Sequence, residues 1–347
     1  MSEQTAALAA PNTGLGRPRG ECYNGLPAGA IIMRFVITGA SGFLGRPLCA
    51  LLVEQGHSVT ALSRNAERAS LVLGSRVACL TWGGTPPSGS QWEHAVAEAD
   101  VVVHLAGEPV AAKAWTPEVK AELKRSRVET TRSLVDVMRA SACKPEAFIC
   151  ASGINYYGDG GEETLTEASP FGSTFLAQLS MAWEHEAQKA EELGVRVVRH
   201  RIGVVLERGG PLDKILRPLP VPISPWALGL GGPIGNGRQW FPWIHLEDAV
   251  RMFVWSSADT RVTGPVNTVS PDLIRNLDFT RALARTMHRP AFFPIPGFVL
   301  KAIVGDFADE LISSQKAVPT IAQKLGFEYR YPGIDEALRS ILEKPRR

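Results

Sequence analysis

The sequence lacks several features that would place the chain in a specialised class of protein. Its 347 residues include only five cysteines. None of them forms a CxxC pair, which argues against a disulfide framework and favours a reducing compartment. The seven histidines show no metal-ligand spacing, so we predict no metal site. The formal net charge is only +2 and the basic residues are scattered, so we expect no nucleic-acid partner.

Long apolar runs and a hydrolase motif are also missing. No uncharged apolar stretch approaches the roughly 18 residues of a membrane span, so we expect no membrane insertion. There is no GxSxG elbow, which argues against a hydrolase. Residues 1–32 are rich in Ala, Gly and Pro, and we expect a disordered N-terminal extension there. We predict a cytoplasmic protein; the alternatives are a chloroplast or another organelle, with residues 1–32 as a transit peptide, and a true start at Met33.

From Arg34 onward, strand-like and helix-like segments alternate. "RFVIT" is a short β-rich run, and "LGRPLCALLVEQG" (44–56) carries leucines at helical spacing before a glycine stop. The runs 35–37 and 101–103 are apolar throughout, as expected for strands buried on both faces. Parallel neighbours need crossovers, so repeated βα units predict an α/β fold: a Rossmann-type doubly wound parallel sheet with a small, mostly helical C-terminal lobe.

The segment "GASGFLG" places three glycines between the first expected strand and the first expected helix. Gly39 permits a tight turn, Gly42 lets backbone N–H groups reach a pyrophosphate, and Gly45 lets the helix pack on the strand. The helix N-terminus then faces the phosphates with unpaired donors. The alternative is a merely tight strand–helix turn. The strand–helix–strand context within about 30 residues favours a dinucleotide site.

The end of the second expected strand distinguishes between the two nicotinamide cofactors. NAD-binding units usually carry Asp or Glu there, which accepts hydrogen bonds from the ribose hydroxyls. Here "TALSR" ends in Ser63 and Arg64, and no acid occurs between His57 and Arg64. A guanidinium attracts a 2′-phosphate, so NADP(H) is favoured. The alternative for Arg64 is a solvated surface arginine.

Proline and glycine suggest how the chain is divided. We expect residues 33–206 to form the NADP-binding domain, with its sheet completed by 238–270. Residues 207–237 are crowded with Pro and Gly, which excludes a long helix and predicts a loop or lid over the site. We expect residues 271–347 to form a small C-terminal substrate lobe of short helices.

Several long motifs in a fixed order resemble those of the extended short-chain dehydrogenase/reductases. They include "TGASGFLG", "HLAG" (104–107) and "SGINYYGD" (152–159). The chain is most similar to an atypical, epimerase-like branch that ends in a C-terminal domain of unknown function. The resemblance extends from Met33 to Leu342, and the segments that mark this branch are "SRVETTRSLV" (126–135), "WEHEA" (183–187), "RIGVVL" (201–206), "GLGGPIGNGRQWFPWIHLEDAV" (229–250), "GPVNTVSP" (264–271) and "RPAFFPIPGFVLKAIVG" (289–305).

This resemblance implies which residues hold NADP(H). They comprise the pyrophosphate turn, the adenosine-phosphate pair, the segment flanking the riboses, two further contacts on the following helix and one residue near the nicotinamide. Arg127 stands where typical members have an Asn. In chain order the implied cofactor residues are Gly39, Ser41, Gly42, Phe43, Leu44, Gly45, Ser63, Arg64, Leu105, Ala106, Gly107, Glu122, Arg127 and Val205.

The resemblance also implies a catalytic Tyr and a Lys four residues later, and this chain lacks both. In typical members the Lys cation lowers the tyrosine pKa, so the phenol exchanges a proton while hydride moves at the nicotinamide. Phe175 or Leu176 takes the place of the Tyr, and Leu179 or Ser180 that of the Lys. The candidates for a replacement are Tyr157, Tyr156, Asn155 and Glu184. The structural alternatives are a packed loop tyrosine and, for Glu184, a surface charge or a buried ion pair.

Two functions are compatible with these residues. The first is an NADP(H)-dependent oxidoreductase or epimerase that acts on a small carbonyl or sugar-like substrate with a non-standard proton donor. The second is a catalytically silent NADP(H)-binding regulatory or interaction protein, for example in cell or plastid division. The missing dyad favours the second, but Trp226, Trp240 and Trp243 in the cleft-forming segments favour the first, and we favour the enzyme. A homo-oligomer is compatible with the sequence but not indicated by it.

Overall fold

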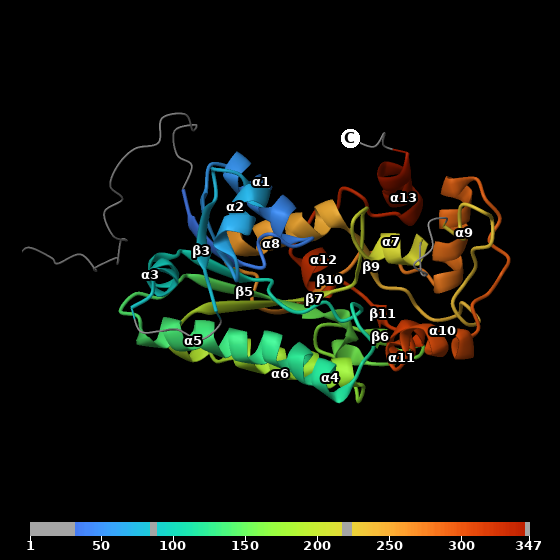
Figure 1. Ribbon diagram of the computed structural model, residues 1–347, viewed down its shortest axis with the longest axis horizontal. Coiled ribbons are helices and arrows are strands. Elements are labelled where there is room, and N and C mark those ends of the chain that lie inside the picture. Colours follow the sequence, from blue (N-terminus) through green and yellow to red (C-terminus); the bar gives the residue numbers. More distant parts are fainter. Residues whose placement is uncertain (1–31, 84–88, 217–223, 344–347) are drawn as a thin grey trace, which may run out of the picture. The chain divides into compact units, whose positions relative to one another are not determined.

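A seven-stranded parallel sheet forms the centre of the computed structural model (Figure 1), which describes residues 32–83, 89–216 and 224–343. The strand order is β10-β7-β5-β4-β1-β2-β3, the doubly wound order of a dinucleotide-binding fold. The predicted fold class is therefore confirmed. The strands are β1 (Arg34–Thr38), β2 (Ser58–Ser63), β3 (Ala78–Thr81), β4 (Val101–His104), β5 (Ala147–Gly153), β7 (Arg196–Ile202) and β10 (Gly264–Thr268).

Helices cover both faces of this sheet (Figure 1). One layer contains α1 (Gly45–Glu54), α2 (Ala66–Leu73) and α8 (Leu246–Ala258). The other contains α3 (Gln91–Glu98), α5 (Thr130–Ala140) and α6 (Phe175–Gln188). The two layers explain why the middle residues of the central strands are apolar on both faces. Phe35, Val36 and Ile37 of β1 are at most 2% exposed, and Val101 to Val103 of β4 at most 1%.

The long helical segment expected over 117–140 contains a change of helix type. It consists of α4 (Pro117–Lys124), a π-helical turn (Arg125–Glu129) and then α5. A π-helical turn widens the helix by one residue and often occurs at functional sites. This turn therefore sets the direction of Arg127, one of the implied cofactor residues.

Two small parallel ladders lie outside the main sheet. β8 (Val204–Leu206) pairs with β9 (Trp243–His245), and β6 (Thr164–Leu165) pairs with β11 (Lys316–Ala317). Of the segment 238–270, β10 joins the main sheet while β9 pairs with β8. The remaining elements are two 3₁₀ turns, η2 (Ile154–Tyr157) and η3 (Glu191–Leu193), and the helices α7 (Pro211–Leu216), α9 (Asn276–Met287), α10 (Gly297–Val304), α11 (Phe307–Ile312), α12 (Thr320–Lys324) and α13 (Ile334–Leu342).

The helical C-terminal region is fastened to the carboxyl edge of the sheet by hydrogen bonds. The side-chain amide of Gln315 donates to the Gly158 carbonyl (2.9 Å), and that of Asn267 on β10 donates to the Val318 carbonyl (2.8 Å). Ser314 Oγ donates to the Gly161 carbonyl (2.7 Å). The loops that follow β5 and the last part of the chain therefore form one joined surface.

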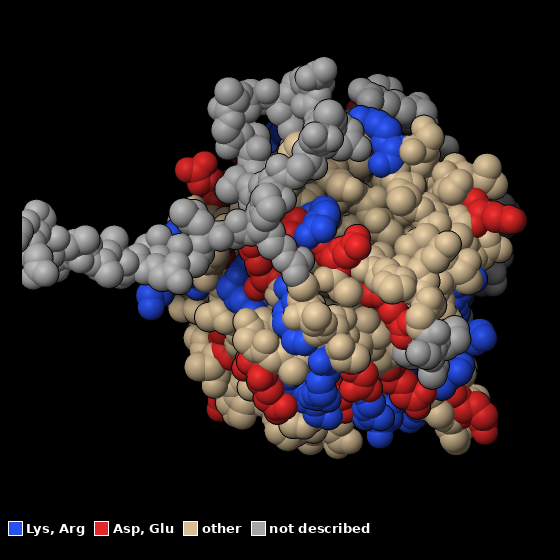
Figure 2. Space-filling model, turned by 90° about the vertical axis from the view of Figure 1, so that its left-hand side faces the viewer, with Lys and Arg blue, Asp and Glu red and all other residues tan. Residues whose placement is uncertain are grey.

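Two predictions concern segments that the structure describes in part or not at all. The N-terminal extension falls almost entirely outside the described residues, which begin at Ile32, and so does the 217–223 part of the expected lid. Among the described helices, none is long and apolar enough to cross a membrane. On the face that Figure 2 shows, basic and acidic side chains alternate and no patch of one sign forms.

Candidate functional site

The glycine turn joins β1 to α1. Gly39 has a φ of +66°, and a Cβ there would lie 2.8 Å from the carbonyl carbon of Leu105. A Cβ on Gly45 would lie 2.3 Å from the Gly39 carbonyl oxygen. Gly42, whose amide donates to that oxygen (2.9 Å), is exposed at the rim. Backbone packing therefore requires Gly39 and Gly45, while Gly42 leaves the rim open.

Helix α1 begins in a way that suits an anion. Its N-cap is Leu44, which makes no side-chain capping bond, and its first turn carries no acid. By contrast, the N-caps of α2, α4 and α6 are Asn65, Thr116 and Thr174, and each accepts a hydrogen bond from its helix. Helix N-termini without such caps present backbone donors and a partial positive charge. The N-terminus of α1 is therefore suited to a phosphate.

Thr38 and His104 fix the segment after β4 beside this turn. Thr38 Oγ1 accepts hydrogen bonds from the amides of Leu105 and Ala106, each 3.2 Å long, and lies 2.6 Å from His104 Nδ1. Burial lowers the pKa of His104 to about 3, so the ring is neutral at pH 7. These two positioning residues were not predicted, although they end neighbouring strands.

Arg64 forms an ion pair with Glu108 at the same edge. Its Nη1 lies 2.9 Å from Glu108 Oε1. The side chain of Arg64 is 84% exposed and that of Glu108 32%. Because β1 lies between β2 and β4, the pair reaches across the carboxyl end of β1. The exposure of Arg64 fits its alternative as a surface arginine, and its contact with the cofactor stays a prediction. No pattern in the sequence indicated its partner Glu108.

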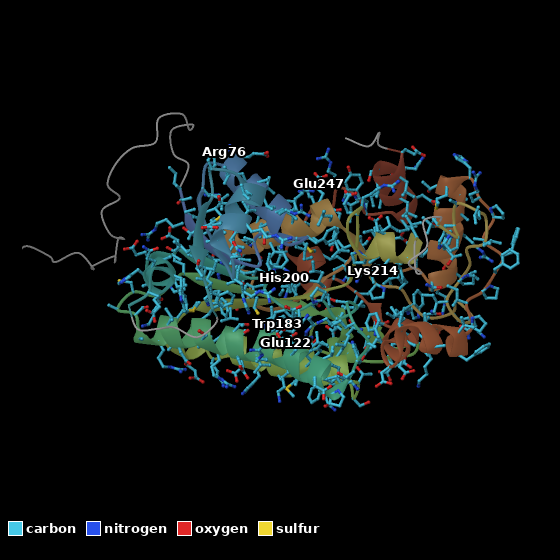
Figure 3. All side chains as sticks on the ribbon, in the orientation of Figure 1. Arg76, Glu122, Trp183, His200, Lys214 and Glu247 are labelled. Carbon is cyan, nitrogen blue, oxygen red and sulfur yellow. The ribbon has the colours of Figure 1, made fainter. Side chains whose placement is uncertain are left out.

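Arg127 lies against the segment implied to flank the riboses. Its Nη2 donates to the Glu108 carbonyl (2.9 Å), and its guanidinium lies 5.2 Å from the ring centre of Trp183. A Cβ on Gly107 would lie 3.1 Å from Arg127 Cζ. Burial lowers the pKa of Arg127 to about 10, and it stays charged at pH 7. Glu122, in the lower helical layer of Figure 3, forms an ion pair with Arg125, and its contact with the cofactor stays a prediction.

The chain after β8 passes over the glycine turn. A Cβ on Gly210 would lie 2.2 Å from Phe43 Cζ, so this backbone sits on the Phe43 ring. Lys214 Nζ then donates to the Ala111 carbonyl in the loop after β4 (3.1 Å). Val205 itself is buried on β8, and its approach to the nicotinamide stays a prediction. Residues 210–214 thus contact both the glycine turn and the loop after β4, and their role as a lid stays a prediction.

At the other end of the edge, Glu184 is a buried ion-pair member. Its two carboxylate oxygens each lie 2.9 Å from Arg201, one from Nε and one from Nη2, and Ser152 Oγ donates to Oε1 (2.7 Å). The side chains of Glu184 and Arg201 are 5% and 4% exposed. Although burial opposes charge on Arg201, its hydrogen bonds to Glu184 raise its pKa.

The tyrosines join the same buried network. Tyr157 Oη donates to Asn267 Oδ1 (2.7 Å) and accepts from Arg201 Nη1 (2.9 Å). Burial raises the pKa of Tyr157 to about 12. The ring centre of Tyr156, which is half-buried, lies 3.5 Å from the Arg201 guanidinium. Tyr157 and Glu184 therefore have the buried partners expected under their structural alternatives, and their catalytic role stays a prediction.

A carboxyl group from the C-terminal region contacts the backbone at the start of α6, where Phe175 or Leu176 replaces the expected tyrosine. Glu310 of α11 accepts from the Leu176 amide at the start of α6 (3.3 Å) and from Asn155 Nδ2 (3.1 Å). It is 7% exposed, and burial raises its pKa. No local pattern could predict this contact, since 134 residues separate Glu310 from Leu176.

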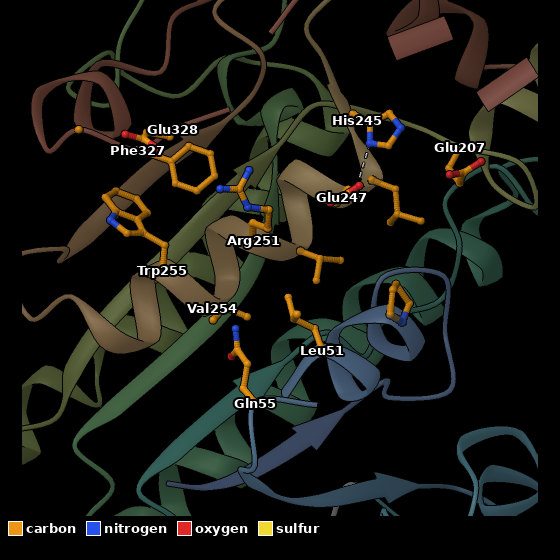
Figure 4. Close-up of a pocket in the computed structure, with 14 residues that line it drawn as sticks. Leu51, Gln55, Glu207, His245, Glu247, Arg251, Val254, Trp255, Phe327 and Glu328 are labelled. Atoms are coloured by element: carbon orange, nitrogen blue, oxygen red, sulfur yellow. Dashed lines mark hydrogen bonds between the residues drawn. The ribbon is translucent and has the colours of Figure 1, made fainter. Parts of the chain in front are cut away.

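A separate hollow of about 770 Å³ lies between α1, α8 and residues 326–328 (Figure 4). Its walls include Leu51 of α1, Gln55 directly after α1, and Arg251 and Trp255 of α8. None of its lining residues belongs to the glycine turn or to the Arg64–Glu108 pair. Within the described ranges, no group of three or more His, Cys, Asp and Glu side chains could hold a metal ion.

Comparison with family models identifies two segments. Residues 35–267 match the NAD dependent epimerase/dehydratase family. Residues 295–341 match a domain of unknown function, DUF1731. The boundary between the two models therefore follows β10, the last strand of the main sheet.

Curated relatives and solved structures agree with this. "Epimerase family protein YfhF" of Bacillus subtilis is 34% identical over 89% of this chain and 98% of its own length. "Epimerase family protein SDR39U1 homolog, chloroplastic" of Arabidopsis thaliana is 33% identical over 90% of this chain and 87% of its own. A crystal structure of human epimerase family protein SDR39U1 (isoform 2) with NADPH has a TM-score of 0.77 at 32% identity, covering 90% of this chain and all of that one.

Proposed function

Because this chain belongs to the NAD dependent epimerase/dehydratase family, we propose that it binds NADP(H) at the carboxyl edge of its sheet. We propose further that it acts as an oxidoreductase or epimerase on a small carbonyl or sugar-like substrate. The observation that carries the cofactor is Arg64 beside an uncapped glycine turn. A solved relative that is similar over its whole length contains NADPH, which supports the same cofactor here.

The residues at this edge fit a dinucleotide. The open rim at Ser41 and Gly42 and the uncapped start of α1 offer backbone donors to the pyrophosphate. Arg64 offers a guanidinium to the 2′-phosphate. Thr38 holds the amides of Leu105 and Ala106 beside this turn, and we propose that these two residues and Gly107 flank the riboses.

When bound, the cofactor supplies or accepts a hydride at its nicotinamide ring. The chain must then move a proton without the usual Tyr/Lys pair. Asn155 and Tyr156 are half-buried, whereas Tyr157 and Glu184 are only 4% exposed. We therefore propose Asn155 and Tyr156, in preference to the other two, for contact with the substrate.

One observation favours a second function, a catalytically silent NADP(H)-binding protein. The buried Arg201 already binds both Glu184 and Tyr157, so the polar groups of these two candidates are engaged in holding the fold. Such a protein would bind the cofactor and report on it to a partner.

Replacing Arg64 by Asp tests the cofactor assignment. We expect NADPH to bind at least about thirtyfold more weakly, because about 2 kcal/mol of charge-assisted hydrogen bonding is lost. NADH should bind nearly as before. Isothermal titration of both cofactors measures this, with Arg76→Asp, at an exposed position before β3, as the control. Equal weakening of both cofactors would contradict the assignment.

A substrate panel separates the two functions. Carbonyl compounds and nucleotide sugars are incubated with protein and NADPH, and absorbance at the nicotinamide band is followed together with sugar interconversion. Turnover that Asn155→Ala or Tyr156→Phe abolishes would support the enzyme. Tight NADPH binding with no turnover across the panel would support the silent protein.

A further inference from the structure

The acid that NAD-binding proteins carry at the end of the second strand is missing here, but a carboxylate from another loop lies beside the end of β2. It comes from Glu108, four residues after β4, and meets Arg64 at 2.9 Å. The strand order β2-β1-β4 brings these two strand ends to either side of β1. The place proposed for the adenosine end of the cofactor therefore contains both an arginine, Arg64, and an acid, Glu108.

The two partners are held differently. The backbone of Glu108 is fixed on both sides: its amide donates to Ser126 Oγ (3.1 Å), and its carbonyl accepts from Arg127 Nη2 (2.9 Å). Both partners belong to the π-helical turn. Arg64, in contrast, is 84% exposed along its side chain. The backbone of Glu108 is thus held in place by other residues, whereas the Arg64 side chain extends through solvent to reach it.

We propose that Glu108 is a specificity-determining residue that tempers the preference for NADP(H). This inference rests on the proposed cofactor site. Glu108 pairs with the guanidinium of Arg64 when no 2′-phosphate is present, and this ion pair breaks when NADP(H) binds. The carboxylate and the 2′-phosphate are both anions that accept from the same guanidinium, so each NADP(H) molecule must displace Glu108.

Displacement is feasible because the pair is exposed. Solvent screens such a pair and makes it weak, whereas the phosphate offers more acceptor oxygens and more charge. NADH brings no phosphate to this place and leaves the pair intact. The ion pair therefore reduces the affinity for NADP(H) without changing the affinity for NAD(H). The difference between the two affinities becomes smaller.

Glu108→Gln tests the proposal, because the amide keeps the shape but loses the charge. We expect NADPH and 2′,5′-ADP to bind about three- to fivefold more tightly, the most that an exposed ion pair is worth. NADH and 5′-AMP should bind within about twofold of the parent protein. Asp136→Asn removes the same charge from an exposed pair with Arg139 on α5 and should change none of the four affinities. Isothermal titration at fixed ionic strength provides the readout.

A double variant locates the effect in Arg64. In an Arg64→Met background, Glu108→Gln should no longer change NADPH affinity. Weaker NADPH binding by Glu108→Gln, an unchanged affinity, or an equal gain in the Arg64→Met background would each overturn the proposal while NADP(H) binding stands. If the parent protein binds neither cofactor at millimolar concentration, the proposed function fails and this inference fails with it. Thermal melting of each variant confirms folding.

Discussion

The two ends of the sheet's carboxyl edge use their polar groups in opposite ways. Around β1 and β2, the glycine turn is exposed, α1 has no side-chain cap, and the Arg64–Glu108 pair faces solvent. Around β5 and β7, the side chains of Glu184 and Arg201 are nearly inaccessible and satisfy each other. The first end has donors available for a ligand, whereas the second has used its donors to hold the fold together.

This difference explains how a chain can keep a cofactor site and lose the usual dyad. Phosphate recognition needs a backbone turn and one guanidinium, which survive changes elsewhere in the sheet. Proton transfer needs an accessible group with a pKa near neutrality. Here burial raises the pKa of Tyr157 to about 12, well away from that range.

The largest effect on stability is expected around β5 and β7, which we call the closed end because its polar groups are buried; the surroundings of β1 and β2 are the open end. Glu184→Ala leaves the Arg201 guanidinium buried without its carboxylate and should lower the free energy of unfolding by about 3–5 kcal/mol. Denaturant titration measures the change. Glu122→Ala, which breaks the exposed pair with Arg125, is the control and should cost at most about 1 kcal/mol. Similar losses in the two variants would remove the contrast between the ends.

Substitutions at the open end should lower the free energy of unfolding less. The largest loss there is expected in the glycine turn. Gly45→Ala puts a methyl group 2.3 Å from the Gly39 carbonyl oxygen, and backbone atoms cannot easily move aside. We expect a loss of about 3 kcal/mol, at the upper end for overpacking, together with weaker NADPH binding. Gly297→Ala has nothing within 4 Å of the added carbon and serves as the control in unfolding and titration. Unchanged stability of Gly45→Ala would contradict the close packing.

The smallest effect concerns pH at the closed end. His200 is buried between Thr268 Oγ1 (2.7 Å) and Ser256 Oγ (2.9 Å), and burial lowers its pKa to about 3. Because this folded-state value lies below the unfolded value of about 6.5, the unfolded chain takes up the proton first. Stability is therefore complete above about pH 6.5 and falls as the pH drops toward 3, by about 1.4 kcal/mol per unit.

Comparison with His200→Gln isolates this residue. The difference in unfolding free energy between parent and variant should shrink by about 2 kcal/mol between pH 6 and pH 4.5. Acid effects of other groups, including His104, are shared by both proteins and cancel. A constant difference for His200→Gln would show that the ring is not held neutral.

Local patterns predicted the parts of the molecule that local geometry decides. The apolar runs of β1 and β4, the glycine turn and Arg64 at the end of β2 all follow from residues close together in the chain. The Arg64–Glu108 pair spans 44 residues, and the Leu176–Glu310 contact spans 134. Such contacts depend on strand order and on how the C-terminal region folds back, which periodicity does not encode. The sequence could name Glu184 as a candidate but not decide between its alternatives.

The carboxylate of Glu167 has a consequence for how the chain folds. Glu167 is only 8% exposed, and its Oε1 accepts from the amides of Asn267 and Ile321, each at 3.1 Å. One carboxylate oxygen therefore joins β10 to the start of α12. Because a buried carboxylate without partners is costly, we expect these two segments to become ordered together around Glu167 during folding.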